Sequence, residues 1–130
     1  MPKVFASIKN DPYKIEIKSP TGNVVIADEP LDKGGKDTGF SPKELLVAAL
    51  SACTSATLRM YIERNGWNIS EIKVETELTE LDGTSTFSRK LVFVGEVTED
   101  QKKRLIVVAN ACPVHKILSS HIEFKTEIIK

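Results

Sequence analysis

The chain has 130 residues, 41% of them hydrophobic and 28% charged, a composition typical of a folded domain rather than a disordered chain. Eighteen basic residues balance eighteen acidic residues, so the charge favours neither a nucleic-acid partner nor an anionic membrane. The first residues include no apolar stretch of signal-peptide length, and no apolar run approaches the roughly 20 residues of a membrane span. We therefore expect a single domain over residues 1–130 in the cytoplasm, where a permanent disulfide would be unusual.

The first third of the chain predicts three short strands followed by a loop. Residues 4–8 are rich in apolar side chains, and residues 13–18 alternate apolar and polar side chains as a half-buried strand does. Residues 24–26 follow a Pro-Thr-Gly-Asn turn signal and form the third expected strand. Residues 28–40 contain one proline and three glycines, which predicts a mobile loop.

A long central helix is the clearest element of the sequence. Residues 41–44, Ser-Pro-Lys-Glu, form a capping box with proline at the first helical position. We expect the helix to run from Pro42 to about Asn65 and to stop at Gly66. Its first half is apolar nearly all round, which indicates deep burial.

The second half of the chain predicts two long strands, two helices and a last strand. In chain order these are residues 72–78 and 87–97, a helix opened by a capping box at 98–101 and ended by Asn110 or Ala111, a helix at 112–120 and a strand at 122–128. The element order is βββ-α-ββ-α-α-β, which is an α+β fold class.

The chain has two cysteines in unlike surroundings. Cys53 lies among small residues in the middle of the long helix, a pattern that fits a buried core residue as well as a nucleophile. Cys112 precedes Pro113 and is expected at a helix N-cap, where free N–H groups and the helix dipole favour a thiolate. His115 and Lys116 lie within one turn of Cys112 and could add positive charge, or could simply be solvated. Local physics thus favours Cys112 over Cys53 as the thiol with the lower pKa.

Other kinds of site have weaker support. The Cys112-x-x-His115 pair resembles half of a metal site, which Cys53 and His121 would have to complete. A cysteine–histidine hydrolase would need a third group to orient its base, and the sequence indicates none. The chain has no dinucleotide-binding or P-loop motif and no Cys-x-x-Cys, so we expect no cofactor and no metal.

Two segments resemble motifs of the OsmC/Ohr family, the osmotically inducible protein C and organic hydroperoxide resistance proteins. Residues 41–53, SPKELLVAALSAC, are similar to the central-helix motif of that family, and residues 110–116, NACPVHK, to its second-cysteine motif. The order of elements agrees over nearly the whole chain, and the similarity is greatest to the general OsmC-like branch. The resemblance implies an intertwined α+β homodimer with two active sites at the subunit interface.

The resemblance also implies an activity, because the characterised members of the family are thiol peroxidases that reduce organic hydroperoxides. By this resemblance Cys53 is the peroxidatic cysteine, which attacks the peroxide and becomes a sulfenic acid. Cys112 is then the resolving cysteine, which condenses with that sulfenic acid to a disulfide. A dithiol or lipoyl-type reductant would restore both thiols by exchange. These roles reverse the ranking of the two thiols from local physics.

The sequence departs from the family at the residues that activate the first cysteine. The hydroperoxide-resistance enzymes use an N-terminal arginine and a glutamate ten residues before that cysteine, whereas this chain has no arginine before Arg59. Lys43 stands ten residues before Cys53, and Glu44 stands nine before it, on the opposite face of an ideal helix with about 100° per residue. The capping box explains Glu44 without catalysis. Lys43, Glu44 and His115 are the candidates for assisting the thiols.

Two other functions fit the sequence. One is a non-catalytic, stress-associated OsmC-like dimer that binds an apolar ligand at its interface, which the missing arginine favours. The other is a general thiol–disulfide redox protein.

Overall fold

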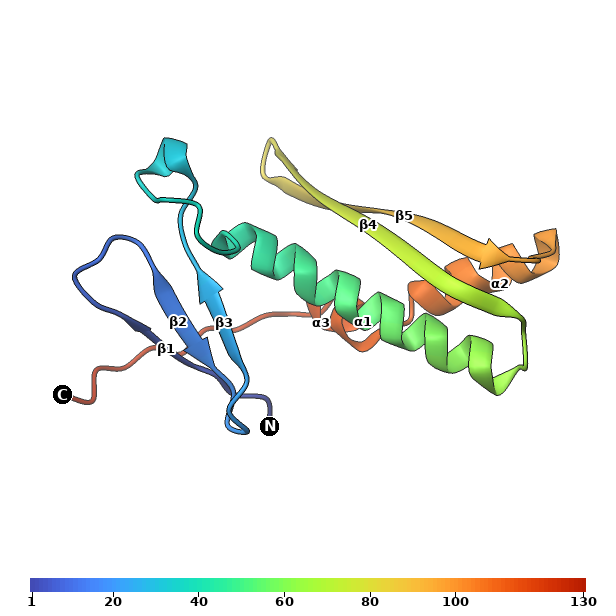
Figure 1. Ribbon diagram of the computed structural model, residues 1–130, viewed down its shortest axis with the longest axis horizontal. Helices are drawn as coiled ribbons and strands as arrows, with labels where there is room; N and C mark the ends of the chain where they lie inside the picture. The colour runs from blue at the N-terminus through green and yellow to red at the C-terminus, as the bar shows by residue number, and fades with distance from the viewer. The chain divides into compact units, whose positions relative to one another are not determined.

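Three short strands form an antiparallel sheet near the N-terminus (Figure 1): β1 (Phe5–Ile8), β2 (Ile15–Lys18) and β3 (Val24–Ala27). Each strand pairs with the next one along the chain, which confirms the three predicted strands. The computed structural model describes residues 1–130, and these divide into two compact units, Met1–Ala48 and Ala49–Lys130. The expectation of a single domain stays a prediction.

The loop after β3 is organised by a buried carboxylate. The side chain of Asp28 is 1% exposed, and its oxygens accept hydrogen bonds from the backbone N–H groups of Glu29, Lys36 and Thr38. The Thr38 hydroxyl donates a further hydrogen bond to Asp28 at 2.6 Å. This hydroxyl is the main reason why the pKa of Asp28 is lowered to about 2, and the three N–H groups act in the same direction against the effect of burial.

Two local features complete this loop. A 3-10 turn covers Leu31–Lys33, and the backbone at Gly35 passes so close to Glu29 that a Cβ atom would lie 1.9 Å from its carbonyl oxygen. Glycine is needed at this position because any side chain would collide with that backbone. The segment that the sequence predicts to be mobile is therefore a hydrogen-bonded loop.

Helix α1 (Pro42–Arg64) has the predicted ends. The N–H of Ser41 donates to Glu44 Oε1 at 2.8 Å, and the N–H of Glu44 donates to Ser41 Oγ at 3.2 Å, so the capping box is reciprocal. Gly66, with a φ of 66°, adopts the left-handed conformation that commonly follows a helix C-terminus. By length and composition alone α1 could cross a membrane, in contrast to the expectation that no apolar run approaches that length, but core helices of soluble proteins pass the same test.

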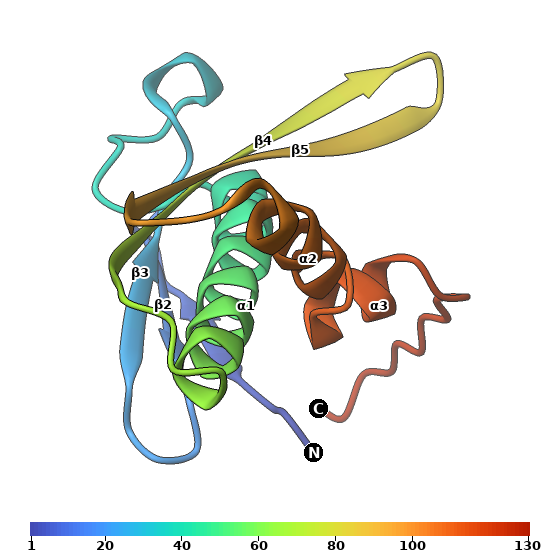
Figure 2. The ribbon, with the colours of Figure 1, turned by 90° about the vertical axis from the view of Figure 1, so that its right-hand side faces the viewer.

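The second unit contains a long hairpin and two shorter helices. Strands β4 (Ile69–Leu81) and β5 (Thr84–Gly95) pair around the turn Asp82-Gly83, whose two residues both have positive φ. Helix α2 (Glu99–Ala109) begins with the predicted capping box at Thr98, and α3 (Pro113–Leu118) follows it. Figure 2 shows α1 lying beside α2 and the hairpin.

One apolar cluster holds this unit together. Leu58 and Ile62 of α1, Ile69 at the start of β4, and Leu105 and Ala109 of α2 are all at most 4% exposed and in mutual contact. Burial of these side chains fixes α2 and the hairpin on one stripe of α1, since apolar residues recur there at helical spacing.

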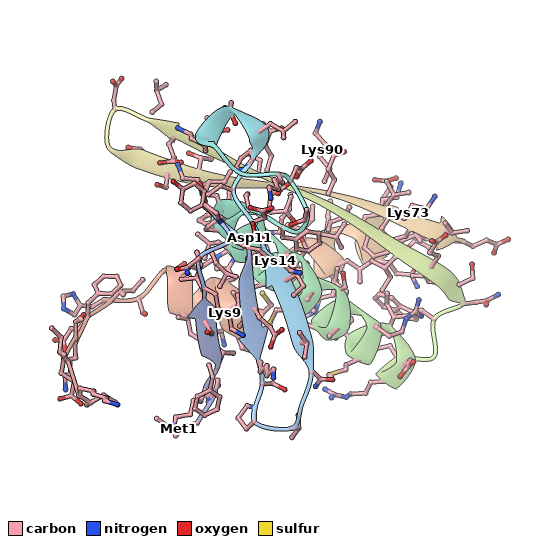
Figure 3. All side chains as sticks on the ribbon, turned by 60° about the vertical axis from the view of Figure 1, so that its left-hand side comes forward. Met1, Lys9, Asp11, Lys14, Lys73 and Lys90 are labelled. Atoms are coloured by element: carbon pink, nitrogen blue, oxygen red, sulfur yellow. The ribbon has the colours of Figure 1, made fainter.

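The outer face of the hairpin is charged. Lys73 on β4 and Lys90 on β5 have exposed side chains (Figure 3), and the Lys90 ammonium lies 3.9 Å from the carboxylate of Glu75, its partner in the ladder. The strands therefore alternate between this solvated face and a face that is half-buried.

The predicted last strand at 122–128 is wrong. Residues 121–130 form neither helix nor strand, and the side chains of Phe124 and Ile128 are 89% and 91% exposed. The alternation of apolar residues is present, but a strand also needs a neighbouring edge for its backbone hydrogen bonds. Within this chain no strand pairs with the segment.

Candidate thiol site

The two cysteines meet at the first turn of α3. The N–H of Val114 donates to Cys53 Sγ at 3.4 Å, and the N–H of His115 donates to Cys112 Sγ, also at 3.4 Å. Cys112 is the N-cap of α3 and Pro113 follows it, as the sequence predicts. Successive backbone N–H groups therefore hold the two free sulfurs next to each other.

The two thiols differ in their access to solvent. Cys112 is 0% exposed, whereas Cys53 is half-buried. The Cys112 sulfur is therefore closed to a molecule arriving from solution, whereas part of Cys53 is open to it.

The environment of Cys112 favours its ionised form. Burial raises the pKa of the Cys112 thiol and is the largest single effect, but the combined opposing effects leave this pKa below its ordinary value. These effects are the hydrogen bonds from the His115 N–H, the Thr54 hydroxyl and the Cys53 thiol, and the positive charge of Arg89. The direction agrees with the interpretation from local sequence that Cys112 readily becomes a thiolate.

Arg89 on β5 connects the elements that surround the sulfurs. Its Nη1 donates to Thr54 Oγ1 at 2.9 Å and to the carbonyl of Ala109 at 3.0 Å. Its Nη2 donates to Asn110 Oδ1 at 3.0 Å and to His115 Nδ1 at 2.6 Å. One side chain thus joins β5 to α1, to the end of α2 and to α3.

Arg89 is not among the candidate site residues predicted from the sequence, although the pattern of β5 contains a signal for it. The half-buried positions of β5 are Phe87, Arg89, Leu91 and Phe93, with exposed residues between them. An arginine in the inward-facing series of an otherwise apolar strand needs hydrogen-bond partners there, and this requirement marks a candidate site.

His115 contacts Arg89 through Nδ1 of its ring, and its predicted role as a positive group beside Cys112 stays a prediction. A guanidinium only donates hydrogen bonds, so His115 Nδ1 accepts the bond from Arg89 and the ring proton lies on Nε2. Lys116, the other expected charge, is exposed. Arg89, on a distant part of the chain, places a positive charge next to Cys112.

Lys43 and Glu44 belong to the other compact unit. The N–H of Ser41 donates to the Glu44 carboxylate, and this bond is the main reason why the pKa of Glu44 is lowered. The structure therefore gives Glu44 a capping role, while Lys43 is exposed in the first turn of α1. A catalytic role for either residue stays a prediction.

The half-site for a metal at Cys112 and His115 gains no further ligands. No group of three or more His, Cys, Asp or Glu side chains is arranged to hold a metal ion. His121, which would have to contribute, lies on the exposed C-terminal segment, with Nε2 3.6 Å from Glu123. The chemistry that this arrangement offers is that of two adjacent thiols.

An α+β chain that brings a cysteine of its long helix to a second, buried cysteine defines a candidate two-cysteine thiol protein. The family model described as OsmC-like protein matches residues 34–127, and the chain belongs to this OsmC-like family. The resemblance seen in the two sequence motifs is thereby confirmed. A search of curated proteins found no match.

Solved structures share the fold. A protein of Psychrobacter arcticus described as an osmotic stress induced and detoxification response protein is 23% identical, with a TM-score of 0.77 over 93% of this chain and 89% of that chain. An OsmC-like protein of Mycoplasma pneumoniae is 20% identical, with a TM-score of 0.76 over 92% and 87%. The organic hydroperoxide resistance protein OhrB of Bacillus subtilis is 23% identical, with a TM-score of 0.60 over 90% and 89%. These similarities confirm the α+β fold class.

Proposed function

We propose that this protein is a two-cysteine thiol peroxidase that reduces organic hydroperoxides. The observation that carries the proposal is the pairing of a half-exposed Cys53 with a buried Cys112 at the first turn of α3. Membership of the OsmC-like family supports it, as do structural neighbours from Bacillus subtilis and Elizabethkingia anophelis that are named organic hydroperoxide resistance proteins.

The greater exposure of Cys53 supports its role as the cysteine that attacks the peroxide, with Cys112 as the resolving cysteine. The Cys53 thiolate attacks one peroxide oxygen, the O–O bond breaks, the second oxygen leaves as an alcohol after protonation, and Cys53 becomes a sulfenic acid. The Cys112 thiolate then attacks the Cys53 sulfur, which forms the disulfide and releases hydroxide that is protonated to water. The two sulfurs together supply both electrons. A lipoyl-type or other dithiol reductant restores the thiols by exchange.

Single-turnover oxidation tests this assignment. Reduced protein treated with cumene hydroperoxide is expected to consume one equivalent per chain, and its intact mass should fall by two hydrogens. Cys53→Ser should abolish consumption. Cys112→Ser should still consume peroxide and keep a sulfenic acid that dimedone traps. Wild-type thiols that survive the treatment would refute the proposal, and a parallel reaction with hydrogen peroxide measures the preference for organic substrates.

General thiol–disulfide exchange is the second candidate, and the lowered pKa of the buried Cys112 thiol favours it. An exchange enzyme would oxidise or reduce a protein disulfide at a useful rate while leaving cumene hydroperoxide untouched. A non-catalytic binding protein would do neither, and its thiols would persist under both treatments.

We also propose that the protein is a homodimer in the cytoplasm. Ala52, Ala56 and Met60 recur at helical spacing on α1 and are exposed, and small residues there permit close approach of a second helix. The exposed apolar residues Phe124 and Ile128 of the C-terminal segment offer further surface for a second copy. A second copy of the chain would cover the apolar side of α1. The reducing environment of the cytoplasm would keep both thiols free.

A further inference from the structure

We propose that Arg89 is the positioning residue of the thiol site: it fixes the turn that carries Cys112 against α1 and places a positive charge beside the Cys112 sulfur. The inference deepens the proposed function and rests on it for its catalytic meaning. The proposal adds a residue of β5 to Lys43, Glu44 and His115, the candidate assistants of the thiols that the sequence predicts.

Every hydrogen bond of the Arg89 side chain ends on a residue within three positions of Cys53 or Cys112. Thr54 follows Cys53 in α1, and its hydroxyl lies 3.7 Å from Cys112 Sγ. Asn110 lies two residues before Cys112, and the backbone N–H of His115 donates to Cys112 Sγ. Loss of the guanidinium would therefore release the turn that presents Cys112 to Cys53.

The charge of Arg89 has no anionic partner among its hydrogen-bond acceptors. These are a hydroxyl, a carbonyl, an amide and an imidazole, all of them neutral. A half-buried guanidinium is expensive to leave without a counter-charge, and the group beside it that can become an anion is the Cys112 thiol. The titratable and charged groups facing this thiol are Cys53 from α1, Arg89 from β5 and His115 from α3.

A stabilised Cys112 thiolate serves both halves of the proposed reaction. In the oxidative half it attacks the Cys53 sulfenic acid, as above. In the reductive half a reductant thiolate attacks the more accessible sulfur of Cys53, so that a mixed disulfide forms and Cys112 leaves as the thiolate beside Arg89. A stabilised thiolate leaves faster in such an exchange. Arg89 thereby favours the departure of Cys112 when the reductant attacks Cys53.

A titration of the Cys112 thiol tests the charge effect directly. In a Cys53→Ser background the ultraviolet absorbance of the remaining thiolate is followed against pH, a readout that needs no access to the buried sulfur. Arg89→Gln should move the midpoint to higher pH, and Arg89→Lys, which keeps the charge, should leave it closer to that of the parent. The matched control is Arg59→Gln, which removes another half-buried arginine, one that donates to the carbonyl of Ile69 at 2.8 Å.

Disulfide formation tests positioning without any peroxide. With both cysteines present, diamide oxidises the dithiol to the disulfide, and Arg89→Gln should slow this step by roughly tenfold because the charge-assisted contacts that hold the turn are lost. Since no hydroperoxide is used, this result stands whether or not the peroxidase proposal survives.

An unchanged titration midpoint in Arg89→Gln would overturn the inference. Equal midpoint shifts and equal thermal destabilisation in Arg89→Gln and Arg89→Lys would also overturn it, because the retained charge of lysine would then have no effect. If Arg89→Gln fails to fold, the Cys53→Ser protein with native Arg89 decides the question. Its Arg89 side-chain N–H signals, followed by NMR, should titrate with the same midpoint as the Cys112 thiolate. Signals that stay fixed while the thiol ionises would contradict the proposal.

Discussion

Thr54 lies where the two thiols and Arg89 meet. It is 0% exposed, its hydroxyl donates to the carbonyl of Leu50 at 2.8 Å and accepts from Arg89, and it lies 3.7 Å from Cys112 Sγ. A hydroxyl has only one proton, so Leu50 and an ionised Cys112 compete for it. Thr54 thereby links the protonation state of Cys112 to the hydrogen bonding of α1.

Replacement of Thr54 by valine should affect both ionisation and stability. Thr54→Val keeps the shape of the side chain but removes a bond that lowers the pKa of Cys112, so the thiolate titration in the Cys53→Ser background should move to higher pH. The loss of an acceptor for a half-buried guanidinium should cost about 1–3 kcal/mol in urea unfolding. Thr57→Val, a half-buried threonine one turn further along α1, is the control. A midpoint equal to that of this control would show that Thr54 does not act on Cys112.

At the scale of elements, Asp28 joins the parts of the loop before α1 by hydrogen bonds, as Arg89 joins the elements around the thiol site. One buried side chain gathers backbone groups that would otherwise lack partners, with bonds to Glu29, Lys36 and Thr38. Neighbouring Gly35 lets the chain come close enough for these bonds. The loop is therefore an ordered element, although it contains almost no regular secondary structure.

This arrangement predicts a specific acid sensitivity. The pKa of Asp28 is about 2 in the folded protein and about 3.9 in an unfolded chain, so its stabilising effect is present above about pH 4 and is lost as the pH falls towards 2. Asp28→Asn should lower the urea midpoint of unfolding at pH 7. Between pH 5 and pH 3 this midpoint should decrease less in the variant than in the wild type. Asp32→Asn, an exposed aspartate of the same loop, is the control. Identical pH profiles for Asp28→Asn and the wild type would rule out this role.

On the scale of the whole molecule, several large apolar side chains are exposed to solvent in the single chain. Met60 is 60% exposed and Phe124 is 89% exposed. Exposed apolar area of this extent marks an interaction surface in soluble proteins. We attribute it to the proposed second copy of the chain.

A charge introduced on the exposed face of α1 should therefore break the dimer. Ala56→Glu would place a carboxylate where a second helix is expected to pack closely, and burial of an unpaired charge is strongly unfavourable. Size-exclusion chromatography with light scattering should give about half of the wild-type mass. Lys73→Glu, on the exposed face of β4, should leave the mass unchanged. A monomeric wild type, or an Ala56→Glu variant of unchanged mass, would contradict the proposed dimer.

The elements that the sequence predicts correctly depend on residues close together in the chain. The capping boxes at Ser41 and Thr98 join residues three apart, and the Asp82-Gly83 turn needs only its own two residues. The position of Cys112 at a helix N-cap has the same local origin, because Pro113 follows it. Propensity and capping act over a single turn, so one segment of sequence contains all the information they require.

The predictions that were wrong concern segments whose structure depends on residues far apart in the chain. Alternation over residues 122–128 predicts a strand, but a strand forms only where another edge supplies hydrogen bonds, and this chain supplies none. The loop at 28–40 is ordered by contacts with a buried carboxylate, which glycine content does not reveal.

The sequence by itself determined the α+β class, the ends of the long helix, the membership of the family and the identity of the two cysteines. Only the tertiary structure decided that the sulfurs share one turn, that Cys112 is buried while Cys53 is half-exposed, and that the charge beside them comes from Arg89. The physical reason is that burial and charge–charge interaction depend on distance in space. Arg89 reaches the thiols because β5 and the end of α2 pack on the same helix.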